Sequence, residues 1–179
     1  MPISRFTLTD QKHEPVAHAQ VVLIARNGTF IDGKTNEHGV ATLDLPDNQI
    51  GTLFIGHPEH RAVLKPDFLL DKEHSLTLEE EHKIGSVVFT LSTGNIPGLN
   101  GRLNPIQDTT MRTYIYGDNV AFNDHPTQPY AFTKKEAFIA EDAQRHQFRV
   151  TVLEIIGRTS LLEFEEQSGR GHSKGQGQD

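Results

Sequence analysis

The chain of 179 residues contains no cysteine and no tryptophan, and it has only two methionines and three tyrosines. Without cysteine it can form neither a disulfide framework nor a thiolate zinc site. Basic residues are also in deficit, with 17 lysines and arginines against 24 aspartates and glutamates and a net charge of −7. Because phosphate contacts need a basic surface, this balance argues against nucleic acid as a partner.

Long hydrophobic runs are missing as well. The first seven residues carry no apolar segment of the kind found in a secretory signal, and no stretch approaches the length of a membrane span. We therefore expect no membrane partner and a cytoplasmic location, with export by a route that needs no cleaved signal as the alternative.

The pattern of the sequence predicts β-structure, most clearly at residues 34–45. A polar turn closed by Gly39 precedes an alternating stretch in which Ala41, Leu43 and Leu45 share one face. A strand has a side-chain period of two, so Thr42 and Asp44 take the other face. We predict a strand with the first three residues buried and the last two exposed.

Two further signals surround this strand. Residues 19–25 form a nearly continuous apolar run, which is typical of a central strand, and Asn27-Gly28 is a hairpin signal. Short predicted strands with turn residues between them recur as far as residue 78. This spacing favours an antiparallel β-sandwich over a parallel sheet, with no helix in residues 16–45.

Two of these segments, PVAHAQVVL at 15–23 and TNEHGVATL at 35–43, resemble the carboxypeptidase regulatory-like, or transthyretin-like, β-sandwich. His18 stands where that family often has glycine. The resemblance covers residues 6–78 and implies a sandwich that serves as a non-catalytic appendage, since function does not follow from fold. The Tyr-Arg-Gly-Ser ending of the transthyretin-like hydrolase is absent from this sequence.

A charged segment at 79–83 marks the predicted domain boundary, giving an all-β first domain at 1–81. Residues 82–167 restart the strand pattern, and 147–156 with 160–164 predict a hairpin. We interpret this part as a small antiparallel, SH3-like β-barrel, in which 134–143 is either a short helix or a strand. Residues 168–179 are rich in glycine, serine and glutamine and predict a disordered tail.

Ten histidines invite a search for a metal site. The best cluster is His57-Pro58-Glu59-His60, but Pro58 argues for a loop and no third ligand is fixed by the sequence. We therefore predict solvent-exposed loop histidines, no metal and no cofactor. No G-x-S-x-G motif and no glycine-rich phosphate loop is present, so no catalytic residue is assigned.

Residues 101–119 form the segment with the strongest binding signal. Arginine and tyrosine are enriched at protein-binding hot spots. The alternative is a loop held by Asp–Thr and Arg–Asp pairs, with tyrosines half-buried in the barrel wall. The candidate binding residues are Arg102, Asp108, Arg112, Tyr114, Tyr116, Asp118 and Asn119.

The function predicted from these patterns is a non-enzymatic protein-binding or adaptor module. The resemblance suggests an accessory role in a secretion or phage-tail-like assembly. The first alternative is a carbohydrate or cell-wall binding module, although three tyrosines and no tryptophan supply few exposed rings. The second alternative is a hydrolase or metalloenzyme with a histidine-containing site.

Overall fold

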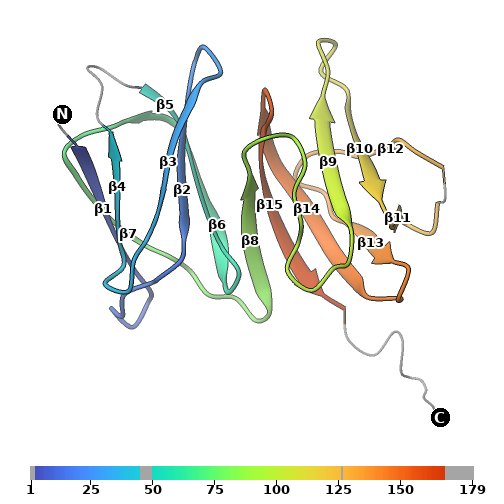
Figure 1. Ribbon diagram of the computed structural model, residues 1–179, viewed down its shortest axis with the longest axis horizontal. Coiled ribbons are helices and arrows are strands. Elements are labelled where there is room, and N and C mark those ends of the chain that lie inside the picture. Colours follow the sequence, from blue (N-terminus) through green and yellow to red (C-terminus); the bar gives the residue numbers. More distant parts are fainter. Residues whose placement is uncertain (1–2, 45–49, 126, 168–179) are drawn as a thin grey trace. The chain divides into compact units, whose positions relative to one another are not determined.

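The computed structural model describes residues 3–44, 50–125 and 127–167, and every regular element in these ranges is a β-strand (Figure 1). None of the described residues therefore forms a helix that could cross a membrane. The all-β prediction is confirmed for this part of the chain. Leu45 and the tail at 168–179 lie outside the described residues.

The chain divides into two compact units, Met1–Val88 and Phe89–Asp179. The division falls inside one strand, β8 (Ile84–Phe89). The predicted domain boundary after residue 81 stays a prediction, because compactness alone does not show that either part folds independently.

The first unit contains two sheets, with strand orders β4-β1-β7 and β3-β2-β5-β6. Their strands are β1 (Ile3–Thr9), β2 (Gln20–Ala25), β3 (Phe30–Lys34), β4 (Val40–Asp44), β5 (Ile50–His57), β6 (His60–Leu69) and β7 (Glu73–Thr77). The apolar run at 19–25 accordingly becomes β2, which lies between β3 and β5 as its composition predicted.

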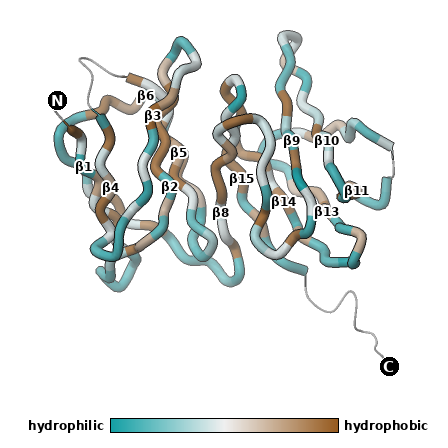
Figure 2. The backbone as a smooth tube through the Cα atoms, in the orientation of Figure 1, coloured by the Kyte–Doolittle hydropathy of each residue, from teal (hydrophilic) through white to brown (hydrophobic). Residues whose placement is uncertain are grey.

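The inward side chains of both sheets meet in one core. Phe6 and Leu8 of β1 pack in the same cluster as Leu23 of β2 and Leu53 of β5. Figure 2 shows the hydrophobic residues of these strands in brown. On β4, Ala41 and Leu43 are buried while Thr42 and Asp44 are exposed, so the predicted alternation is confirmed. At about 25 cal/mol per Å² of buried apolar surface, this core is the main stabilising term of the unit.

One strand pair departs from the predicted antiparallel pattern. β1 pairs with β7 in parallel, with Thr9 opposite Thr77, whereas the other pairs in this unit are antiparallel. Parallel neighbours leave a sheet at the same end. The chain segments that follow β1 and β7 therefore emerge side by side, which matters for the polar cluster described below.

The second unit also contains two groups of paired strands. One sheet has the order β12-β10-β9, and in the other β11, β13, β14 and β15 are neighbours in that order. The strands are β9 (Arg102–Gln107), β10 (Thr113–Asp118), β11 (Val120–Phe122), β12 (Tyr130–Ala131), β13 (Phe138–Asp142), β14 (Gln147–Ile156) and β15 (Thr159–Glu166). The predicted hairpin at 147–164 is confirmed.

One prediction for this unit needs correction, one strand was not predicted, and one open alternative is decided. The described strands form two separate sheets and not one closed barrel. Residues 102–107 form β9, which the sequence analysis had not predicted, since Pro105 and Asn104 obscure its pattern. The ambiguous segment 134–143 contains a strand, β13, because Phe138, Ala140 and Asp142 alternate inward along it.

Candidate functional site

The loop that joins β9 to β10 is held by one carboxylate. Asp108 Oδ1 accepts hydrogen bonds from the backbone N–H groups of Thr110 and Arg112, both at 3.0 Å, and from the Thr110 hydroxyl at 2.8 Å. Asp108 Oδ2 accepts from the Arg112 guanidinium at 2.9 Å. The Thr110 hydroxyl bond, followed by the Arg112 and Thr110 bonds, holds the pKa of Asp108 below its ordinary value.

This carboxylate fixes both the loop and the side chain that ends it. Arg112 remains 76% exposed although its guanidinium is paired. Between them, Met111 has a backbone φ of 67° and a side chain that is 68% exposed. The loop thus presents one cationic and one apolar side chain in a defined position.

The strand that follows carries two aromatic rings on one face. Tyr114 and Tyr116 are two residues apart on β10, and their ring centroids lie 6.2 Å apart at 85°, an edge-to-face contact. Ile115 between them is fully buried on the opposite face. Tyr114 is half-buried and Tyr116 is 43% exposed, so the second ring is the more available for contact.

These side chains meet in a pocket of about 920 Å³, which we call the Tyr116 pocket. It is formed by the end of the β9–β10 loop, by β10, and by β12 with the residues on either side of it. Its lining residues are Met111, Arg112, Thr113, Tyr114, Tyr116, Pro129, Ala131, Phe132, Thr133 and Lys134. These ten side chains include two cations but neither a carboxylate nor an imidazole that could act as a general base.

Hydrogen bonds attach the second wall of the pocket to β10. The Phe132 backbone N–H donates to the Thr113 carbonyl oxygen at 3.1 Å, and the Thr113 hydroxyl donates to the Phe132 carbonyl oxygen. Lys134 is paired with Glu154 Oε1 at 2.7 Å. The wall is therefore fixed in place before any ligand binds.

The predicted binding residues separate into two groups. Arg112, Tyr114 and Tyr116 line the Tyr116 pocket, and Asp108 positions Arg112. The remaining three do not line the pocket. Arg102 and Asp118 form an exposed cross-strand ion pair at 3.3 Å, and the Asn119 amide donates to the Asn100 carbonyl oxygen at 2.7 Å. These three residues were predicted to contact a ligand, but in the structure their side chains bond to other residues of the chain.

The residues at 129–134 are the part of the pocket that sequence reasoning missed. The sequence predicts a strand at residues 130–133, but nothing in its pattern shows that this strand pairs with β10. The pairing rests on only two residue pairs, Tyr114 with Ala131 and Ile115 with Tyr130. Short edge pairings of this kind leave little periodic signal in a sequence.

The prediction of exposed histidines at positions 57 and 60 is wrong. His57 is 9% exposed and His60 is 7% exposed, although the two residues pair at the turn that joins β5 to β6. Their Nδ1 atoms lie 3.0 Å apart. Burial, followed by the proximity of His60, lowers the pKa of His57, which favours its neutral form.

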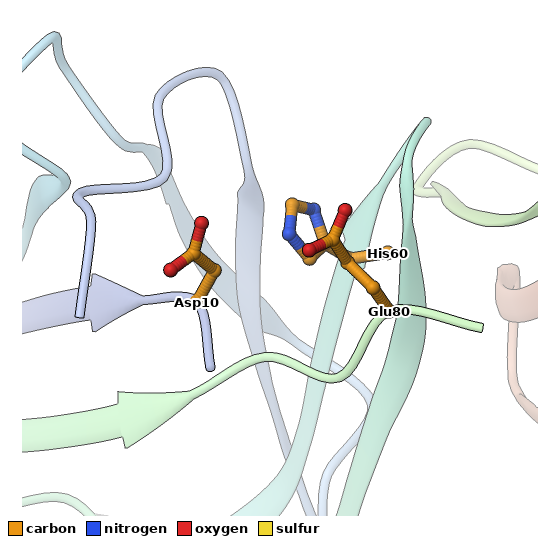
Figure 3. A group of neighbouring side chains, drawn as sticks. All are labelled: Asp10, His60 and Glu80. Atoms are coloured by element: carbon orange, nitrogen blue, oxygen red, sulfur yellow. The ribbon is translucent and has the colours of Figure 1, made fainter. Parts of the chain in front are cut away.

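A second polar cluster lies around His60. Asp10, His60 and Glu80 each place one potential metal-binding atom within 4.8 Å of the other two (Figure 3). The sequence indicates only the neighbouring histidines as candidate ligands and fixes no third ligand. Asp10 and Glu80 were missed because they are separated from His60 by 50 and 20 positions in the chain and are brought together only by the sheets.

Comparison with known proteins adds one relative. No protein-family model matches the sequence. The chain is 31% identical over 157 residues to a protein of Aquimarina amphilecti named 3′ cyclic ADP-D-ribose synthase AaTIR. The match covers 88% of this chain and 48% of the relative, so the chain spans about half the length of the curated relative it matches.

Proposed function

We propose that this protein is a non-enzymatic protein-binding module that recognises its partner through the Tyr116 pocket. The observation that carries the proposal is the convergence of Arg112, Tyr114 and Tyr116 with the exposed Met111 on one pocket. Tyrosine, arginine and methionine are the residue types enriched in protein interfaces, and clusters of them supply most of the binding energy.

The way these side chains are held supports the same function. Arg112 is anchored by Asp108, and the Phe132 side of the pocket is bonded to Thr113. A surface whose side chains are already fixed loses less conformational entropy on association. The pocket therefore combines hot-spot residues with preorganisation, and the partner that fits is a protein segment with an apolar or aromatic side chain.

The proposal includes a fold assignment for the first unit. We propose that the first unit is a transthyretin-like sandwich and that the second is an accessory β unit built of two sheets. The backbone at His18 supports the first assignment, because its φ of 66° lies in the region that glycine favours, and this is a family glycine position. Such modules occur as accessories to larger proteins.

The relative supports an accessory role of this kind. Its name describes a synthase, but this chain matches only about half of it. We propose that the shared part recognises a partner for an enzymatic activity that resides elsewhere. A role in a secretion or phage-tail-like assembly remains a narrower version of the same proposal, resting on the sandwich resemblance alone.

A carbohydrate ligand is the second candidate, favoured by the position of Tyr114 and Tyr116 on one face of β10. A nucleotide related to the product named for the relative is a further ligand worth testing, since Arg112 and Lys134 supply cations beside aromatic rings. Both cations already have carboxylate partners, which weakens their attraction for a phosphate.

The proposal is tested by capture from native lysate with the whole chain as bait, comparing wild type with Tyr116→Ala, Arg112→Ala and Arg102→Ala. Arg102 is the matched control, because it is an exposed arginine in an exposed ion pair outside the pocket. We expect one protein that wild type and Arg102→Ala capture and the two pocket variants lose. Binding isotherms with that protein should show losses of about 2 kcal/mol or more for the pocket variants.

Thermal denaturation of the same variants separates binding from stability. Tyr116→Ala and Arg102→Ala alter exposed positions, so we expect changes in unfolding free energy of about 0.5 kcal/mol or less. Loss of stability with unchanged partner affinity would contradict the proposal. A glycan array and a titration with 3′ cyclic ADP-D-ribose complete the experiment, and binding there that depends on Tyr116 would replace the protein partner with that ligand.

A further inference from the structure

We propose that Asp10, His60 and Glu80 form a binding site for a divalent transition-metal ion, for which Zn²⁺ is the best fit. Their ligand atoms come from three separate chain segments and lie within 4.8 Å of one another. Figure 3 shows the imidazole of His60 between the carboxyl groups of Asp10 and Glu80. Zn²⁺ binds both histidine nitrogen and carboxylate oxygen, and three protein ligands leave its fourth position for water.

The strongest support is an unsatisfied nitrogen. His60 is 7% exposed, and its Nε2 atom is buried without a hydrogen-bond partner among the described residues. Nearly all buried polar side-chain atoms in native proteins have a partner, so each exception calls for an explanation. An ion held by the adjacent carboxylates would supply that partner.

The hydrogen bonds behind His60 identify which nitrogen faces the ion. His57 Nε2 lies 2.9 Å from the Ala17 carbonyl oxygen, which can only accept, so His57 carries its hydrogen on Nε2. His57 Nδ1 is then an acceptor, and the Glu59 backbone N–H donates to it at 3.0 Å. His60 Nδ1, also 3.0 Å away, must donate to the same atom.

Neutral His60 with its hydrogen on Nδ1 has its lone pair on Nε2. That is the tautomer a metal requires, and it is fixed by a hydrogen bond from the other ring nitrogen, as in most protein metal sites. The chain of contacts from Ala17 through His57 to His60 thus holds the ring in a ligating state. His57 itself has both nitrogens engaged and serves to position the ring.

The carboxylates are held by their own segments. Thr9 pairs with Thr77 in the parallel β1–β7 ladder, so Asp10 and Glu80 emerge from the same end of this sheet. The Glu80 backbone N–H donates to Gln11 Oε1 at 3.3 Å, and the Arg61 backbone N–H donates to the Glu79 carbonyl oxygen at 2.8 Å. These bonds connect the chain segments that supply the three ligands.

Charge and ligand type select the ion. Two carboxylates and a neutral imidazole bring two negative charges, which a divalent cation balances. Imidazole suits zinc and its neighbours in the first transition row, whereas Mg²⁺ and Ca²⁺ prefer oxygen ligands alone. Asp10 Oδ1 accepts the Lys12 and Glu14 backbone N–H groups at 2.8 and 2.9 Å, and these bonds hold the carboxylate in place.

The test is a Zn²⁺ titration of the whole, chelator-treated chain against a chromophoric zinc indicator, with Mg²⁺ in parallel. We expect one Zn²⁺ ion to bind per chain, and we expect Mg²⁺ not to displace it. Asp10→Asn and Glu80→Gln should each weaken Zn²⁺ binding by about 10-fold or more, since even the loss of a group that only supports a ligand has an effect of this size. Glu59→Gln, which removes a charge next to His60 in the sequence, should leave the affinity unchanged.

Both ligand variants are expected to fold. Glu80 is exposed, and asparagine caps an equivalent loop at position 36, so Asp10→Asn keeps the local backbone bonds. Saturating Zn²⁺ should raise the melting temperature of wild type and of Glu59→Gln more than that of either ligand variant. A wild-type chain that binds no stoichiometric Zn²⁺, or binding that persists unchanged in both ligand variants, would overturn the site.

Discussion

The loop at residues 36–40 in the first unit and the loop at residues 108–112 in the second share one backbone arrangement in different surroundings. In each, the first side chain accepts the N–H groups of the third and fifth residues, and the fourth residue has a positive φ. Gly39 occupies that fourth position in the first loop and packs against β1. Met111 occupies it in the second loop and is exposed at the Tyr116 pocket.

The same arrangement occurs twice more, at residues 10–14 and 142–146. Asp10 and Asp142 are the capping residues, and His13 and Arg145 have φ values of 66° and 73°. In all four loops the first residue's backbone N–H donates to the fifth residue's carbonyl oxygen. An aspartate or asparagine side chain that satisfies two N–H groups is therefore sufficient to build the loop, and the fourth residue is free to vary unless neighbours crowd it.

The largest effect on the unfolding free energy is expected at Gly39, because neighbouring atoms crowd this fourth loop residue. A Cβ at Gly39 would lie 2.5 Å from the Leu8 carbonyl oxygen and 3.1 Å from the Val16 backbone nitrogen. Gly39→Ala also places a side chain at a φ of 77°. We expect it to lower the unfolding free energy by about 2–4 kcal/mol, combining left-handed strain with overpacking.

Urea denaturation followed by circular dichroism measures this loss. Met111→Ala is the control, because it keeps a Cβ at the equivalent position of an uncrowded loop. Similar unfolding free energies for the two variants would show that the surroundings of the two loops do not differ as described.

These loops also explain which parts of the structure the sequence could predict. The turn before β4 was predicted because Gly39 is a recognisable signal for positive φ. The β-branched and aromatic residues of 111–116 predict a strand there, but Met111 belongs to the loop and β10 begins at Thr113. A methionine or arginine with positive φ gives no such signal, since the loop is specified by an aspartate three positions earlier.

The candidate sites also divide into parts that have a local sequence signal and parts that do not. Arg112, Tyr114 and Tyr116 were predicted because one short segment contains them. The other wall of the pocket and the cluster of Asp10, His60 and Glu80 depend on pairing between distant segments, including the parallel β1–β7 pair. No local periodicity encodes such pairing, because it is decided by which sheets bury the core.

An intermediate effect is expected at Asp142, whose side chain is fully buried. Its Oδ2 accepts from the Asn100 backbone N–H and faces His146 Nδ1, both at 2.8 Å. Asp142→Asn keeps the Oδ1 bonds, as Asn36 does, but turns an amide N–H group toward the Asn100 N–H. We expect a loss of about 1–3 kcal/mol in unfolding free energy.

The pH dependence of stability provides the second measurement on this variant. Burial alone would raise the pKa of Asp142, but the bonds from Asn100 and His146 outweigh it and lower the pKa below its usual value. A lowered folded pKa contributes stability above the unfolded value, near 4, that is lost as pH falls through the folded value. Wild type should therefore lose stability below about pH 4 more steeply than Asp142→Asn, and parallel curves would contradict this assignment.

The smallest effect on the unfolding free energy is expected at Met111, where the substitution should raise stability and not lower it. Left-handed backbone is unfavourable for a residue with a Cβ, so Met111→Gly relieves strain in the folded state while it adds freedom to the unfolded chain. Because the side chain is 68% exposed, little packing is lost, and we expect a gain in unfolding free energy of no more than about 1 kcal/mol.

The same substitution removes an apolar lining residue of the Tyr116 pocket, so partner affinity should fall while stability rises. Arg145→Gly changes the equivalent position of a loop outside the pocket and should leave affinity unchanged. Thermal denaturation and a binding isotherm on both variants give the answer: equal affinity for Met111→Gly and wild type would mean that this loop, like the one at 36–40, has only a structural role.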